Sequence, residues 1–224
     1  MTFSIVARCP RTGEFGIAAI TALPAVGKLL THAAPGAGAI ATQARLNPYL
    51  GIDGIRLLQS GMWADEVIEA LRQHDPRMDR RQLGVVDRDG RAAIWTGEGC
   101  KPWAGGQAHR DFCVQGNRLE GPQVIEAAVR AFGEKPNTPL VERLIRALAA
   151  GMAEGGDRKE ERSSTVYVVG SEEYPLWDIR VDDHDDPVDE LMRLHSVFAE
   201  KLLPHIRRMA TRANPAGIFE DGDV

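Results

Sequence analysis

Thr2 is the residue whose type and position could do chemistry with the least help from other side chains. If Met1 is removed, Thr2 carries both a hydroxyl group and a free α-amine. A threonine hydroxyl is a weak nucleophile until a base accepts its proton, and an α-amine with a pKa of about 8 can be that base. The sequence therefore predicts an N-terminal nucleophile. The alternative is that the chain simply starts here, with a strand pattern from residue 2 and no leader before it.

Two further segments could assist this nucleophile. Thr21 closes the second strand pattern, and a short turn between the first two strands would let it approach Thr2 and orient the amine. In the segment VQGN, the side-chain amide of Asn117 and the backbone N–H of Gly116 could stabilise an oxyanion. Asparagine beside glycine is also ordinary turn chemistry, so that second interpretation stays open.

The segment GGDRKEERSS, residues 155–164, places opposite charges just before a strand pattern. Arg158 could bind an anionic group of a substrate, and Asp157 could help to position it. Paired glycines also allow a helix to end and a solvated loop to follow, which is the structural alternative.

The segment RVDDHDDP crowds carboxylates and an imidazole at the end of a strand pattern. Asp183 and His184 could contact a substrate, and the cluster as a whole could bind a divalent cation. Carboxylates before Pro187 also suit the positive end of the helix that follows, and we favour this capping interpretation. We expect no bound metal and no organic cofactor.

Composition limits the class of protein. The chain has 224 residues, 43% hydrophobic and 26% charged, which fits one sizeable domain. A net charge of -5 without a basic stripe argues against nucleic acid as a partner. No apolar run approaches the roughly 20 residues that span a bilayer, and three widely spaced cysteines fit neither a disulfide framework nor a metal site. We expect a cytoplasmic protein that does not bind membranes.

The order of periodic segments predicts the fold class. Alternating patterns predict strands at residues 2–8, 14–21, 36–44, 82–97, 111–117, 163–170 and 176–181, with Asp89-Gly90 as a hairpin turn. Helical spacing predicts a short helix around residues 55–58 and another with one face along 63–71, two more within 122–152, and a last one from Pro187 that breaks near Pro204. Adjacent strand groups separated by helix pairs indicate an α+β fold with antiparallel sheets. We place one domain at residues 1–203 and a polar tail at 204–224.

Several phrases together resemble the uncharacterised family DUF1028. They are TFSIVAR with TGEFGIA, GAIATQA, WTGEGCKPWAG, VQGN, GGDR and RVDDH, and they occur in the order expected for that family, from residue 2 to about 194. The resemblance implies membership of the N-terminal nucleophile (Ntn) hydrolase superfamily. It also implies a four-layer αββα sandwich in which two antiparallel sheets lie between helical layers.

What the resemblance implies for function is hydrolysis of an amide or ureido C–N bond of a small molecule, with Thr2 as nucleophile. A possible homodimer rests on the resemblance and on the long last helix. A rival hypothesis is a non-catalytic binding or assembly protein on the same fold, since a fold does not carry a function with it. A third is metal-assisted hydrolysis at the acidic cluster, centred on Asp182, Asp183 and His184.

Overall fold

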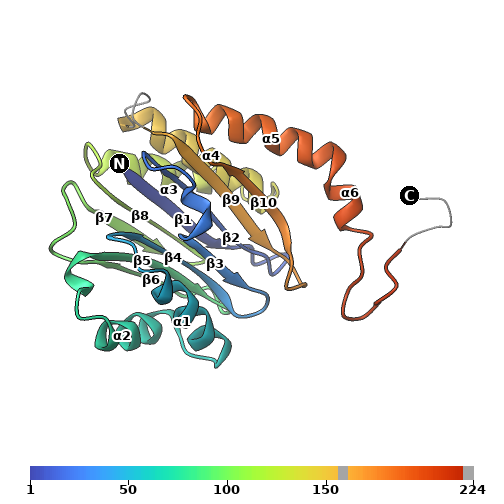
Figure 1. The fold of residues 1–224 in the computed structure, drawn as a ribbon, viewed down its shortest axis with the longest axis horizontal. Helices are drawn as coiled ribbons and strands as arrows, with labels where there is room; N and C mark the ends of the chain where they lie inside the picture. The colour runs from blue at the N-terminus through green and yellow to red at the C-terminus, as the bar shows by residue number, and fades with distance from the viewer. Residues whose placement is uncertain (156–160, 219–224) are drawn as a thin grey trace.

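The first strand of the chain lies in the middle of a six-stranded antiparallel sheet. A computed structural model describes residues 1–155 and 161–218 (Figure 1). In spatial order the sheet consists of β10 (Pro175–Val181), β9 (Ser163–Val169), β2 (Phe15–Thr21), β1 (Thr2–Arg8), β8 (Phe112–Asn117) and β7 (Gly105–His109). Every residue of β2 is buried, as its small and apolar residues on both faces predict.

A second, four-stranded antiparallel sheet packs against the first. It consists of β3 (Thr31–Ala34), β4 (Gly38–Ala44), β5 (Arg81–Asp87) and β6 (Ala92–Thr96), in that order. The predicted hairpin turn joins β5 to β6, and Gly90 adopts the positive φ of 78° that such a turn favours. Side chains that include Val6, Ile17 and Val86 form the apolar layer between the two sheets.

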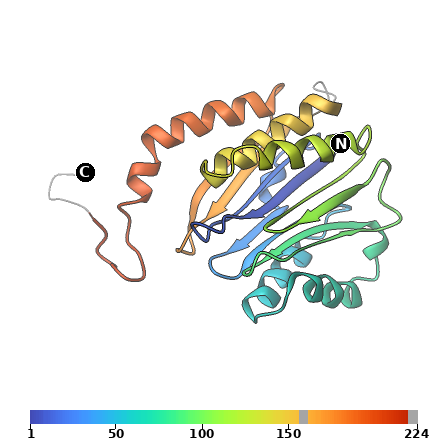
Figure 2. The ribbon, with the colours of Figure 1, turned by 180° about the vertical axis from the view of Figure 1, so that it is seen from behind.

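Helices lie on the outer face of each sheet (Figures 1 and 2). Against the four-stranded sheet pack α1 (Pro48–Gln59) and α2 (Ala64–His74), and against the six-stranded sheet pack α3 (Gln123–Gly133) and α4 (Leu140–Gly155). Short 3-10 helices, η1 (Val26–Lys28) and η2 (Met78–Arg80), precede β3 and β5. The alternation of β1 explains the packing, because Phe3 and Ile5 face α3 and α4 while Val6 faces the other sheet.

The C-terminal part begins with α5 (Pro187–Lys201), followed by α6 (Leu203–Ile206). The Asp186 side chain accepts a hydrogen bond from the Asp189 N–H and caps α5, which is the predicted capping interpretation for that carboxylate. The helix breaks at Leu202, two residues before the predicted break at Pro204. The segment after α6 extends away from the sheets and returns to the β9–β10 turn, where Tyr174 donates a hydrogen bond to the Ala210 carbonyl (Figure 2).

The predicted α+β class with antiparallel sheets is confirmed. Two strands were not predicted, β3 and β7, because THAA and GGQAH are short and carry almost none of the branched or aromatic side chains that mark a strand. In the described residues, no helix is both long enough and apolar enough to cross a membrane.

Candidate functional site

Thr2 lies between two of the residues predicted to assist it. In the strand register Thr2 is opposite Thr21 on β2 and opposite Asn117 on β8. The Thr2 and Thr21 hydroxyl oxygens are 2.7 Å apart, and Thr21 donates its proton to the Met1 carbonyl at 3.1 Å. Because a hydroxyl has one proton, Thr2 is then the donor to Thr21. The Thr2 side chain is therefore oriented by its neighbour while Met1 is in place.

A cavity of about 220 Å³ opens at Thr2, on the side of β1 that faces the four-stranded sheet. Leucines and other apolar side chains of the β2–β3 connection form much of its wall, and Thr2, Thr21 and Gln43 contribute polar atoms. Two alanines of the lining, Ala25 and Ala44, have φ values of 60° and 69°. A left-handed backbone is uncommon for alanine, and such conformations often occur near functional sites.

The N-terminal ammonium group points into the protein rather than into solvent. The Met1 nitrogen lies 3.2 Å from a carboxylate oxygen of Glu161, and the two side chains are only 5% and 1% exposed. An ion pair this deeply buried fixes the position of the chain end. Glu161 was not singled out from the sequence, where it is one of several charges in what looks like a solvated loop.

A chain of buried amides connects the two sheets beneath Thr2. Ser4 donates to Gln43 at 2.7 Å, Gln43 donates to Gln82 at 2.8 Å, and Gln115 donates to Ser4 at 2.7 Å. Asn117 donates to the same Gln82 oxygen at 3.0 Å. This inter-sheet amide network was missed from the sequence, although a polar residue amid the apolar positions of each strand is its signal. It holds the Asn117 side chain in one orientation.

The acidic cluster lies at the same end of the sheet but farther from Thr2, beyond β10. Arg162 donates to Asp183 at 2.8 Å and also to Asp185, and its hydrogen bond to Asp183 holds the pKa of that carboxyl below its usual value. The ring of His184 accepts the Asp186 N–H at 2.9 Å. No group of three or more histidine, cysteine or acidic side chains in the described parts could hold a metal ion. Asp157 and Arg158 lie outside the described residues.

The three cysteines are poor nucleophiles where they stand. Cys9 and Cys113 are buried, and burial raises the pKa of Cys113 to about 12. Burial also raises the pKa of Cys100, whose thiol donates to the Arg81 carbonyl at 3.4 Å. Since the thiolate is the reactive form, the geometry favours the threonine over any of the cysteines.

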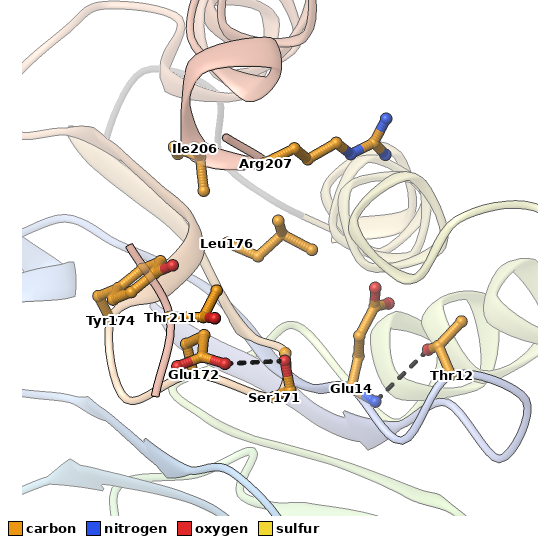
Figure 3. Close-up of a pocket in the computed structure, with 10 residues that line it drawn as sticks. Thr12, Glu14, Ser171, Glu172, Tyr174, Leu176, Ile206, Arg207 and Thr211 are labelled. Atoms are coloured by element: carbon orange, nitrogen blue, oxygen red, sulfur yellow. Dashed lines mark hydrogen bonds between the residues drawn. The ribbon is translucent and has the colours of Figure 1, made fainter. Parts of the chain in front are cut away.

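A larger cavity lies away from Thr2. It has a volume of about 330 Å³ and is formed by the β1–β2 turn, the β9–β10 turn and the C-terminal segment (Figure 3). Thr12 and Glu14 of its lining belong to the turn between β1 and β2, at the opposite end of the hairpin from Thr2. None of the residues singled out from the sequence lines this cavity.

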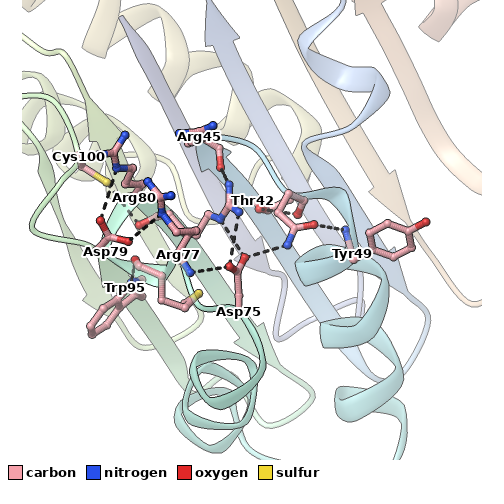
Figure 4. Close-up of polar contacts among 12 residues, drawn as sticks. Thr42, Arg45, Tyr49, Asp75, Arg77, Asp79, Arg80, Trp95 and Cys100 are labelled. Atoms are coloured by element: carbon pink, nitrogen blue, oxygen red, sulfur yellow. Dashed lines mark hydrogen bonds and ion pairs between the residues drawn. The ribbon is translucent and has the colours of Figure 1, made fainter.

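Asp75 forms a second polar cluster near the start of β5 (Figure 4). It accepts hydrogen bonds from Asn47 at 2.8 Å, from Arg81 at 2.9 Å and from the Arg77 N–H at 2.8 Å. Burial alone would raise the pKa of Asp75, but these hydrogen bonds outweigh it and lower the pKa. Arg81 also donates to the Arg45 carbonyl, so the cluster fixes the chain just after β4.

Comparison with known proteins agrees with the sequence motifs. The chain matches the family of unknown function DUF1028 over residues 2–191, and it belongs to that family. No curated protein matches it. A DUF1028 protein, SPO2555 from Silicibacter pomeroyi, is 26% identical with a TM-score of 0.89, over 98% of this chain and 99% of that one. Anbu, an ancestral β-subunit from Yersinia bercovieri, is 14% identical over 93% and 98% of the two chains, with a TM-score of 0.45 that is too low to bear on this protein.

Proposed function

We propose that this member of the DUF1028 family is an N-terminal-threonine amidohydrolase that cleaves an amide or ureido C–N bond of a small molecule. The observation that carries the proposal is the position of the Thr2 hydroxyl, 2.7 Å from the Thr21 hydroxyl at the mouth of a 220 Å³ cavity. On this proposal the sheets and helices form the four-layer αββα sandwich of Ntn hydrolases.

The chemistry follows from the two groups that Thr2 would carry after loss of Met1. The hydroxyl oxygen attacks the substrate carbonyl carbon while the α-amine accepts the hydroxyl proton. The C–N bond then breaks, the same proton passes to the leaving nitrogen, and an ester of Thr2 remains. Water, deprotonated by the amine, hydrolyses this ester and restores the threonine.

Thr21 and Asn117 have separate roles in this scheme. Thr21 lies within hydrogen-bond reach of the Thr2 hydroxyl and orients it. Asn117 donates one of its two amide protons to Gln82, which leaves the second for the oxyanion that forms on the substrate. The backbone N–H of Gly116 is the second candidate donor to this oxyanion. Gly116 is paired with Phe3 in the β1–β8 register, so it lies one residue pair away from the pair formed by Thr2 and Asn117.

Met1 decides whether this chemistry is available. A retained Met1 turns the Thr2 amine into an amide and removes the base. The buried ion pair between the Met1 ammonium group and Glu161 favours a second candidate function, a non-catalytic binding protein in which the chain end is a structural element. Excision of Met1 instead breaks this ion pair and frees the Thr2 amine.

Intact mass and N-terminal sequencing of protein purified from its native cell separate the two functions. A chain that begins at Thr2 is expected for the hydrolase, and a chain that retains Met1 in all molecules contradicts it. A β-lactone probe then tests nucleophilicity without knowledge of the substrate, because an activated hydroxyl opens the lactone and gains its mass.

The matched variants for this probe are Thr2→Ala and Thr12→Ala. Thr12 lies at the opposite end of the β1–β2 hairpin and is exposed. We expect labelling of the wild type and of Thr12→Ala, and loss of labelling in Thr2→Ala. Labelling that persists in Thr2→Ala would show that the reactive nucleophile is a residue other than Thr2.

A further inference from the structure

Four basic residues from four separate segments line one cavity of about 290 Å³. We call it the basic pocket and define it by Arg45, Arg80, Lys101 and Arg118, with Asn117 and Ala44 in the same wall. Figure 4 shows two of these side chains, Arg45 and Arg80, beside the Asp75 cluster. Arg45 follows β4, Arg80 precedes β5, and Lys101 and Arg118 belong to the loops on either side of β7 and β8.

The charge of this pocket is one-sided. Among the residues that the structure describes, no acidic residue is part of its lining, and Arg80 has one carboxylate partner, Asp79, at 3.5 Å in an exposed pair. In the described part of the chain, the side chains of Arg45, Lys101 and Arg118 form no ion pair or hydrogen bond. The protein as a whole carries a net charge of -5, so a concentration of positive charge here runs against its overall balance. A cleft lined by charge of one sign attracts ligands of the opposite sign.

The backbone that carries these charges is held in place. The Arg45 N–H donates to the Arg80 carbonyl at 3.1 Å, and the Arg118 N–H donates to the Lys101 carbonyl at 3.0 Å. Each of these hydrogen bonds joins two walls of the pocket. Arg118 itself has a φ of 57°, a conformation rare for a side chain of this size. The backbone positions from which the positive side chains extend are therefore fixed.

The basic pocket borders the proposed nucleophile. Asn117, in its wall, faces Thr2 across the β1–β8 register, and paired residues in antiparallel strands have Cα atoms about 4.5–5.5 Å apart. Ala44 lines both the basic pocket and the cavity at Thr2. An anionic group in the basic pocket would thus lie only a few bonds from a carbonyl presented to Thr2.

We propose that the basic pocket binds a carboxylate of the substrate, so that the protein acts on small acidic amides such as N-acyl or N-carbamoyl derivatives of amino acids. The link to Thr2 rests on the proposed hydrolase function, whereas the carboxylate site itself does not. Planar guanidinium groups match the two oxygens of a carboxylate, and the pocket offers three arginines for it.

Equilibrium binding of succinate, with succinamide as the neutral analogue of the same shape, tests the site. The measurement uses the full chain carrying Thr2→Ala, so that turnover does not affect it. We expect succinate to bind, succinamide to bind at least about tenfold more weakly, and added salt to weaken succinate binding.

Matched charge removals complete the test. Arg118→Gln and Lys101→Gln each remove a positive charge from the pocket, and both residues are exposed and bonded only through their backbone. Arg110→Gln removes the same charge from the β7–β8 turn, at the opposite end of the strands. We expect a loss of about tenfold for each pocket variant and none for Arg110→Gln.

Three results would overturn the inference: equal binding of succinate and succinamide, no binding of succinate, or equal effects of the pocket and control variants. Binding of inorganic phosphate in preference to succinate would overturn the assignment to a carboxylate. If succinate binds as expected but the native protein retains Met1, the carboxylate site stands and the hydrolase function fails.

Discussion

Replacement of Gln82 by leucine tests how far the inter-sheet amide network stabilises the protein. Gln82 is fully buried on β5 and accepts hydrogen bonds from Gln43 at 2.8 Å and from Asn117 at 3.0 Å. It donates to the Gly116 carbonyl at 2.7 Å and to the Thr96 hydroxyl at 2.9 Å. Leucine has a similar size, so the change removes hydrogen bonds without leaving a large cavity.

The expected cost comes from the groups that lose a partner. Gln43 keeps its second bond, to the Gln115 carbonyl at 3.2 Å, whereas the Asn117 amide loses its bond to Gln82 and the Gly116 carbonyl loses the short bond from Gln82. Leaving a buried polar group without a hydrogen bond costs about 1–3 kcal/mol. Two such groups, offset in part by apolar burial of leucine, give a net loss of about 2–4 kcal/mol in the free energy of unfolding.

Urea denaturation followed by tryptophan fluorescence measures this difference. The control is Gln73→Leu on the exposed face of α2, which we expect to change the free energy of unfolding by less than about 0.5 kcal/mol. If Gln82→Leu were as stable as the wild type, the network would contribute no net stability. The role of the network would then be to position the Asn117 side chain rather than to stabilise the fold.

Two further predictions concern titratable groups outside that network. Asp75→Asn is expected to lower the free energy of unfolding at pH 7 by about 3 kcal/mol, because it leaves the largely buried Arg81 without its partner. Since the folded pKa of Asp75 is lowered, the contribution of its charge is complete above about pH 4 and is lost as the pH falls through the folded pKa. Variant and wild type should therefore converge in acid, and a constant difference across pH 2–7 would contradict this account. In thiol titration of the native protein we expect slow labelling of Cys100 and none of Cys9 or Cys113 until the chain unfolds, because both are about 1% exposed or less.

Most strands and helices could be predicted because the spacing of their apolar residues indicates which side of each element is buried. The helix α3 is an example, because the apolar positions expected from its sequence are the ones that pack in the core beside the six-stranded sheet. They are Val124, Ile125, Ala128 and Phe132. The strand β7 is the opposite case. Gly105 and Gly106 have no side chain to alternate, and the strand exists because β8 offers it a partner.

The candidate site could be predicted only in part, for a related reason. Thr2 and Thr21 lie at the two open ends of one hairpin, so a local argument was enough to pair them. Asn117 reaches Thr2 through a pairing between residues more than one hundred positions apart, which no spacing in the sequence reveals. The ion pair of Glu161 and the basic pocket depend on such long-range contacts as well. Taken singly, each of their charged residues looks in the sequence like part of a solvated loop.

The location of Thr2 limits what can control its chemistry. β1 has a neighbour on each side, and Thr2 is paired in the register with both, so its backbone cannot move without breaking the centre of the sheet. On the proposed mechanism, a nucleophile held this firmly needs no conformational change to become oriented, because its geometry exists before substrate binds. What the sheet cannot supply is the free amine. On the proposed mechanism the transition from inactive to active protein is therefore covalent, the loss of one residue, and variants that loosen the sheet should reduce activity by displacing the threonine rather than by changing its protonation.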